Sequence, residues 1–315
     1  MKLHKVDTIL RSKQEFQTRN YVSWGLEYKL GLRWQDYLYY PSLFAGVTLL
    51  SSACFLSTMD SIQEGSYVLL FHTPRKKWLT RVAKGKKMHT HLGIIDLDAV
   101  IGLPYGTCIK TTEDRDVYLL KPTIYDFVMK SERKTQIVYP KDMGYIASRT
   151  GLSNGSIVLE VGTGSGALTT FMAGIVKPNG HVYTYDVRPE FIEVAKRNIE
   201  KVGLEKFVTI NQHDIKDGID VKDADLAVVD LGDPWTVVKH VHDCLKGSGC
   251  FVAICPTMNQ IEKLATTLKE SNFADIECAE IIIRNIEARE GMTRPSFRMI
   301  GHTAYLVFAR KVYPK

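Results

Sequence analysis

The sequence predicts an α/β protein with a mostly parallel, Rossmann-like sheet, preceded by a small β-barrel-like domain. Three observations lead to this prediction. Strand and helix patterns alternate from residue 154 onward, a glycine-rich loop follows the first of these strands, and acidic residues follow the next ones. Such alternation is typical of parallel sheets, because the crossover between two parallel strands usually takes a helix.

The alternating part contains five expected strands and four expected helices. The strands are placed at Ile157–Val161, His181–Asp186, Val208–Asn211, Asp225–Asp230 and Cys250–Ile254. The helices are placed at Gly166–Ile175, Pro189–Val202, Trp235–Leu245 and Met258–Lys269. Two further runs in the tail, Ile276–Ile286 and Thr303–Arg310, are expected to form an antiparallel closing pair.

Residues 59–125 are expected to form the small domain, and residues 126–315 the larger α/β domain. Short β-rich runs broken by Gly and Pro occupy Ser66–His72, Trp78–Val82, Thr107–Ile109 and Val117–Leu120. The preceding 58 residues are interpreted as an extension that is poorly ordered or not part of the native protein, with Met59 as the functional start. Their apolar run of about 14 residues is shorter than the ~20 that span a bilayer, so no membrane anchor is expected.

Composition sets broad limits. The chain has 45% apolar and 24% charged residues and a net charge of +6, which excludes wholesale disorder and is compatible with a polyanionic partner. Its six cysteines form no C-x-x-C pair, so we expect reduced thiols in a cytoplasmic protein and no metal site. The pairs His89-x-His91 and His240-x-His242 lack a neighbouring thiol or carboxylate, and no metal is assigned to them.

A run of seven basic residues surrounds Trp78 in the small domain. It is a candidate RNA-facing surface. A solvated hairpin with one aromatic side chain packed inward explains the pattern equally well. The basic residues are Arg75, Lys76, Lys77, Arg81, Lys84, Lys86 and Lys87.

The segment Glu160-Val-Gly-Thr-Gly-Ser-Gly166 follows the first strand and opens a helix. In an α/β sheet this is where nucleotide-like ligands bind, and glycines allow close approach to the backbone. Gly162-x-Gly164-x-x-Ala167 also satisfies the loose dinucleotide fingerprint, so a nicotinamide cofactor has to be weighed.

Acidic residues favour S-adenosylmethionine over a dinucleotide. Glu160 would repel a pyrophosphate and attract the ammonium of a methionine moiety. Asp186 ends the second strand, where it can accept hydrogen bonds from ribose hydroxyls, and Asp214 can accept from an adenine amino group. The three acids together describe an adenosine with a cationic tail.

These residues form the E-x-G-x-G-x-G pattern of class I methyltransferases, and further motifs narrow the resemblance. They are Thr135-Gln-Ile-Val-Tyr-Pro-Lys-Asp142, Asp230-Leu-Gly-Asp-Pro-Trp235, His89-Thr-His-Leu-Gly93, Arg294-Pro295 and Gly301-His-Thr303. From about Ser61 to Lys311 the chain resembles the TrmI family of tRNA (adenine-N1)-methyltransferases, especially its archaeal members.

The resemblance implies that Asp230 is the catalytic carboxylate and that Tyr139 sits beside the target base. It also implies a homotetramer that modifies an adenosine of the tRNA T-loop at position 58, and in archaeal relatives sometimes also 57. The predicted S-adenosylmethionine site comprises Ile137, Glu160, Gly162, Gly164, Ser165, Gly166, Ala167, Leu168, Asp186, His213, Asp214 and Asp230.

Two alternatives stay open at this stage. An isoaspartyl-type protein methyltransferase would share the glycine loop but not the other motifs. A noncatalytic tRNA-binding subunit would be expected to have lost the cofactor loop, whereas Glu160, its three glycines and Asp230 are all present. Trp235 and Asp233 are ambiguous, since Pro234 favours a turn there.

Overall fold

The computed structural model describes residues 60–314. The interpretation of residues 1–58 as an extension lies outside the described residues. The division at residues 125 and 126 stays a prediction. The described residues belong to two compact units, one with residues 60–62 and 102–105, the other with residues 63–101 and 106–314. In the first, the Ile62 amide donates to the Leu103 carbonyl at 2.9 Å.

The small N-terminal part is β-rich, as predicted, and its strands pair antiparallel. Its four-stranded sheet has the order β2-β1-β6-β5, with β1 Tyr67–Thr73, β2 Lys76–Arg81, β5 Cys108–Lys110 and β6 Asp116–Leu120. A second pair, β3 (Lys87–Thr90) with β4 (Gly93–Asp96), was not predicted. These strands have only four residues each, too few to show a clear alternation of apolar and polar side chains.

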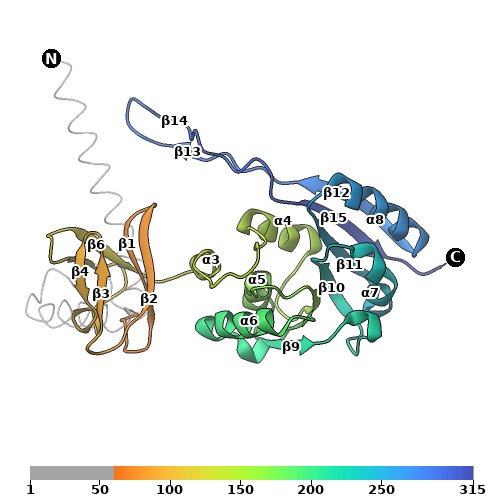
Figure 1. Cartoon of the computed structure of the whole chain (residues 1–315), viewed down its shortest axis with the longest axis horizontal. Helices are drawn as coiled ribbons and strands as arrows, with labels where there is room; N and C mark the ends of the chain where they lie inside the picture. Colours follow the sequence, from red (N-terminus) through yellow and green to blue (C-terminus); the bar gives the residue numbers. More distant parts are fainter. Residues whose placement is uncertain (1–59, 315) are drawn as a thin grey trace, which may run out of the picture. The chain divides into compact units, whose positions relative to one another are not determined.

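The larger sheet has seven strands in the order β12-β15-β11-β10-β7-β8-β9. Of these, β12, β15, β11, β10 and β9 are labelled in Figure 1. The strands are β7 Ile157–Val161, β8 His181–Asp186, β9 Val208–Gln212, β10 Ala224–Val229, β11 Leu245–Cys255, β12 Phe273–Glu280 and β15 Tyr305–Lys311. The neighbours from β11 to β9 pair in parallel, and β15 pairs antiparallel with both β11 and β12. The Rossmann-like sheet and its antiparallel closing pair are therefore confirmed.

Helices cover both faces of this sheet. Alternate residues of each buried strand enter two separate apolar clusters; Val158 enters one and Leu159 the other. The first cluster contains residues of α3 (Ile124–Met129), α4 (Pro140–Thr150), α5 (Ala167–Val176) and α6 (Pro189–Val202). The second contains residues of α7 (Val238–Cys244) and α8 (Met258–Glu270).

Two sequence predictions need correction. The expected helix at Trp235–Leu245 is a 3₁₀ turn, Pro234–Val237, followed by α7, and β11 already begins at Leu245. The expected strand Ile276–Ile286 ends at Glu280. The chain then leaves the sheet to form a hairpin of β13 (Ile286–Glu287) and β14 (Arg294–Pro295). Apolar residues at 281–283 resemble a buried strand in sequence, but Ile282 and Ile283 are exposed.

Candidate active site

The glycine-rich loop joins β7 to α5 at the carboxyl end of the parallel strands. Gly162 and Gly166 have φ angles of +96° and +73°, in the left-handed region that favours glycine. A Cβ atom at Gly162 would overlap the Asp230 carbonyl oxygen, and one at Gly166 would lie 2.9 Å from the Ala195 Cβ. The glycines are therefore required by the packing of this loop on its own fold, in addition to any approach of a ligand.

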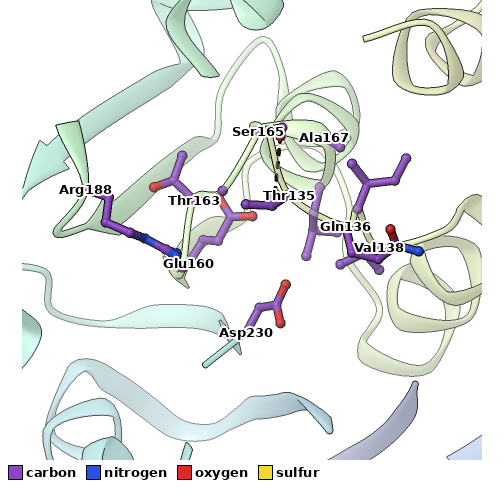
Figure 2. A pocket seen from close by; sticks show the side chains of 13 residues that line it. Thr135, Gln136, Val138, Glu160, Thr163, Ser165, Ala167, Arg188 and Asp230 are labelled. Atoms are coloured by element: carbon purple, nitrogen blue, oxygen red, sulfur yellow. Dashed lines mark hydrogen bonds between the residues drawn. The ribbon is translucent and has the colours of Figure 1, made fainter. Parts of the chain in front are cut away.

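Thirteen residues line a pocket at this loop (Figure 2). They come from the segment before α4, from β7, from the loop and the start of α5, from the turn after β8 and from the end of β10. Eight of them belong to the predicted cofactor site: Ile137, Glu160, Gly162, Gly164, Ser165, Ala167, Leu168 and Asp230. The structure thus brings together residues that are up to 93 positions apart in the sequence, from 137 to 230.

Glu160 is the most deeply buried acid of the pocket, with 1% of its surface exposed. The Thr169 hydroxyl donates to its carboxylate at 2.5 Å. Burial raises the pKa of Glu160 to about 8; hydrogen bonds from Thr169 and Thr184 oppose this shift, and the charges of Asp230 and Asp186 add to it. A cation bound beside Glu160 would favour the ionised carboxylate that the protein alone disfavours.

Asp186, at the end of β8, fixes the glycine loop. One carboxylate oxygen accepts from the Gly164 amide at 3.0 Å, and the other accepts from the Arg188 amide at 3.0 Å and from its guanidinium at 3.2 Å. A carboxylate has about four acceptor positions, so one is left, but Asp186 does not line the pocket and its side chain is only 2% exposed.

Asp230 follows β10 and is held in place through its backbone, since its amide donates to the Val161 carbonyl at 2.8 Å. In Figure 2 its side chain points into the space between Arg188 and Gln136. The residue is exposed, since its side chain opens to the pocket, although the pocket walls partly desolvate its carboxylate. This desolvation raises the pKa of Asp230 to about 6; the Arg188 charge lowers it and the Asp186 charge adds to the increase.

Tyr139 lies immediately beyond the pocket lining, as the residue that precedes α4. It is half-buried, and its carbonyl accepts from the Asp142 and Met143 amides. The next residues join α4 to the tail, because the buried Asp142 carboxylate accepts from Lys141 at 2.7 Å and from Thr303 at 2.9 Å. Two of the sequence motifs are thereby connected.

His213 and Asp214 lie after β9, and neither lines the pocket. Both are exposed; the His213 amide donates to the Asp186 carbonyl at 3.2 Å, and the Asp214 carboxylate accepts from the Lys216 amide at 3.0 Å. Trp235 packs under the Lys263 ammonium, 4.1 Å from the ring centre, and Asp233 pairs with Lys216. These two residues have structural partners outside the pocket.

Five pocket residues were absent from the predicted site: Thr135, Gln136, Val138, Thr163 and Arg188. The segment from Thr135 carried a signal, since it belongs to a motif noted in the sequence. Thr135 contacts Ser165 of the glycine loop at 3.2 Å between their hydroxyl oxygens (Figure 2). Arg188 lies two residues after Asp186, but its direction cannot be deduced from sequence spacing.

Within residues 60–314, no three His, Cys, Asp or Glu side chains are placed to hold a metal ion. Within the same range, no helix combines the length and the apolar character needed to cross a membrane.

Comparison with known proteins adds to this geometry. Residues 116–292 match the family model described as tRNA methyltransferase complex GCD14 subunit. The chain is 38% identical to the tRNA (adenine(57)-N(1)/adenine(58)-N(1))-methyltransferase TrmI of Methanocaldococcus jannaschii, over 78% of this chain and 95% of the relative. The chain belongs to the TrmI family.

Solved structures agree with this membership. A TrmI of Aquifex aeolicus, titled a tRNA (m1A58) methyltransferase, is 34% identical with a TM-score of 0.72 and covers 81% of this chain and 100% of its own. A protein of Thermotoga maritima titled an S-adenosylmethionine-dependent O-methyltransferase is 39% identical with a TM-score of 0.78, covering 81% and 96%. The class I methyltransferase fold and the TrmI resemblance are thereby confirmed.

Proposed function

We propose that this TrmI-family chain transfers a methyl group from S-adenosylmethionine to N1 of an adenosine in tRNA. The observation that carries the proposal is the Asp230 carboxylate, which faces the glycine-loop pocket in a chain of this family. The names of the relatives support a target in the T-loop at position 58, with position 57 as a second target of the archaeal enzyme.

The charges of the pocket support S-adenosylmethionine as the cofactor. Its charged lining residues are Glu160, Asp230 and Arg188. A pyrophosphate would meet two carboxylates there, whereas a sulfonium and an ammonium would be attracted by them. Glu160 would hold the ammonium, and the remaining acceptor position of Asp186 would take a ribose hydroxyl. His213 and Asp214 would lie at the adenine end, with Ile137 and Leu168 as apolar walls.

When bound, the cofactor supplies a methyl group on a sulfonium, which is transferred in line to the adenine N1. Asp230 accepts from the N6 amino group of the target base and so increases electron density at N1. It also stabilises the positive charge that spreads from N1 to N6 in the transition state. Tyr139 stacks on the purine or orients it.

The target base has to leave its stack, because N1 lies on the Watson–Crick edge. Extrusion costs a few kcal/mol, which contacts elsewhere on the tRNA must offset. The direct test uses labelled S-adenosylmethionine with two acceptors, an unmodified tRNA transcript and an isoaspartyl peptide. Label in the tRNA alone supports the proposal. Label in the peptide alone supports the protein methyltransferase, and label in neither supports a noncatalytic subunit.

The proposed assembly is a homotetramer in the cytoplasm, with the hairpin of residues 281–303 in its interfaces. This hairpin exposes seven large apolar side chains, including Phe297 with 86% of its surface exposed. Such a concentration of exposed apolar side chains is typical of an interaction surface. The residues are Ile282, Ile283, Ile286, Met292, Phe297, Met299 and Ile300.

Replacement of residues 284–298 by a short Gly-Ser linker should reduce the oligomer to smaller species, since it removes apolar area that an interface would bury. Light scattering after size exclusion measures the mass. Tyr118→Ser, which changes an exposed aromatic outside the hairpin, serves as the control. An unchanged mass in the linker variant would contradict the role of the hairpin.

Cofactor affinity should rise with pH up to about pH 8, and NAD should not bind. The pKa of Glu160 is raised to about 8, so below this pH the carboxyl is protonated in the free protein and must release a proton when an ammonium binds. Titration calorimetry in buffers of different ionisation enthalpy measures the released proton. Glu160→Gln should bind more weakly at pH 8 and lose the Glu160-linked proton release; equal release in both proteins would contradict the assignment.

A further inference from the structure

The basic residues around Trp78 have different surroundings in the structure. Lys77 lies 3.3 Å from the Asp126 carboxylate, and the Arg81 guanidinium donates to the Gly65 carbonyl at 3.0 Å. Lys84 pairs with Glu64 at 3.7 Å. Lys76 differs from these three residues, because it lines a second pocket within the small β-rich part of the chain.

This second pocket is formed by three turns of the chain. The β1–β2 hairpin contributes His72 and Lys76, the β3–β4 turn contributes Thr90 and His91, and the turn between β5 and β6 contributes Glu113 and Arg115. It shares no lining residue with the pocket at the glycine loop.

Close packing holds the pocket in shape. A Cβ atom at Gly93, where φ is +101°, would lie 2.8 Å from both the Glu113 and the Thr112 side chains. The Ile94 amide donates to the Thr112 hydroxyl at 2.9 Å, and the Thr111 hydroxyl donates to the Leu92 carbonyl at 2.5 Å. The β3–β4 turn is therefore fixed against the 111–115 turn, and the pocket needs little reorganisation before it binds a ligand.

The charge of the pocket suits an anion. Lys76 and Arg115 are cationic at neutral pH, and no ion pair joins either of them to another residue in the range 60–314. Glu113 is the one acid among the lining residues. His72 Nδ1 lies 2.8 Å from the Asp116 carbonyl oxygen, which only accepts, so Nδ1 carries a proton and Nε2 is left for other partners.

An aromatic pair borders these cations. The rings of Trp78 and His91 are 5.4 Å apart and tilted by 57°. Trp78 is half-buried and His91 is exposed. Trp78 lies two residues after Lys76 on β2, so the two side chains project from the same face of the strand. Unstacked bases of RNA bind on such aromatic surfaces while Lys and Arg hold the adjoining phosphate.

We propose that this pocket binds one unstacked nucleotide of the tRNA, away from the base that is methylated. Its phosphate lies between Lys76 and Arg115, its base packs against the Trp78–His91 pair, and Glu113 accepts from a ribose hydroxyl. The proposal rests on the proposed function for the identity of the RNA, but it concerns a separate set of residues.

The test measures binding of an unmodified tRNA transcript to the full chain over a range of salt concentrations. Lys76→Ala and Arg115→Ala should each raise Kd about three- to tenfold, and each should reduce the salt slope by about one for the lost phosphate contact. Their double variant should lose less than the sum, because both contact one phosphate. Lys86→Ala is the matched control, as an exposed residue of the same run outside the pocket, and should have the smaller effect on both quantities.

A transcript carrying 4-thiouridine should crosslink to the peptide that contains Trp78 or His91 under near-ultraviolet light, and Trp78→Phe should retain binding where Trp78→Ala weakens it. Calorimetry with S-adenosylmethionine should give the same affinity in all variants, which also shows that they fold. Normal Kd and salt slope in the double variant would overturn the proposal. The proposal would also be overturned if inorganic phosphate bound in a manner that depends on Lys76 while the variants left tRNA binding unchanged. The pocket would then be a site for free anions only.

Measurement of tRNA methylation distinguishes a failure of this proposal from a failure of the proposed function. The pocket variants should raise KM for tRNA and leave kcat within about twofold, since the pocket does not contact the reacting atoms. If the chain methylates no tRNA but the variants weaken RNA binding, the proposed function fails and the pocket stands. If methylation is normal and KM is unchanged in every pocket variant, the pocket proposal fails alone.

Discussion

Asp230→Ala is expected to reduce turnover by about 10²- to 10³-fold, comparable to the removal of one preorganised electrostatic partner. Single-turnover transfer of labelled methyl to tRNA measures the effect. Affinity for tRNA should change little, because phosphate contacts dominate it. Cofactor affinity should shift modestly, since a carboxylate near the sulfonium is lost.

Two further variants sharpen this test. Asp230→Asn keeps an acceptor without the charge, so a rate between those of Asp230→Ala and the unaltered protein separates hydrogen bonding from electrostatic stabilisation. Asp233→Ala removes a neighbouring acid that pairs with Lys216 and should keep near-normal turnover. If Asp230→Ala methylates at the normal rate, the carboxylate is not catalytic and Asp233 or Tyr139 takes the role.

The same carboxylate sets the pH dependence. Its pKa is raised to about 6, so the ionised form that accepts from N6 is lost as the pH falls through 6. We expect kcat/KM for tRNA to fall about tenfold per pH unit well below that value. A profile that stays flat down to pH 5 would exclude Asp230 as the titrating group.

Gly162→Ala should abolish cofactor binding and lower thermal stability. The added methyl group overlaps the Asp230 carbonyl oxygen. The Asp230 amide donates to the Val161 carbonyl of β7, so this backbone cannot move aside as a flexible side chain would. Overpacking of this kind costs about 1–3 kcal/mol in addition to the strain at positive φ. Calorimetry and thermal unfolding measure the two effects.

Gly155→Ala is the matched control for this variant. Its φ of +89° is close to the +96° of Gly162, but nothing lies within 4 Å of the added Cβ. It should therefore lower the melting temperature through backbone strain and leave cofactor affinity unchanged. Equal cofactor affinities in both variants would show that the overlap with Asp230 has no consequence for the site.

The α/β part was predictable because its strands are strongly apolar and its helices have clear ends. Helix α6 has a clear start and a clear end, since Pro189 starts it and Gly203 in the left-handed conformation ends it. Helices α3 and α4 were missed. Helix α3 has only six residues, and α4 has buried polar Asp142 among its few apolar positions, so neither shows a long apolar period.

The part of the candidate site that lies at the ends of the parallel strands was predictable from the sequence. Residues at the ends of consecutive parallel strands meet at one edge of a sheet, which placed Glu160, Asp186 and Asp230 together. Contacts between distant segments were not predictable. Thr135 joins the glycine loop and Arg188 turns into the pocket because of tertiary packing, and the overlap that requires Gly162 depends on where β10 ends.

The central claim is methylation of adenine N1 in the T-loop of tRNA, and mapping of the product tests it most directly. An unmodified transcript is incubated with the protein and S-adenosylmethionine, digested, and analysed by mass spectrometry of its fragments, with Asp230→Ala as the inactive reference. We predict 1-methyladenosine at position 58, alone or with position 57, and none with the variant. A methyl group on another atom or another nucleotide, or its absence, would contradict the account.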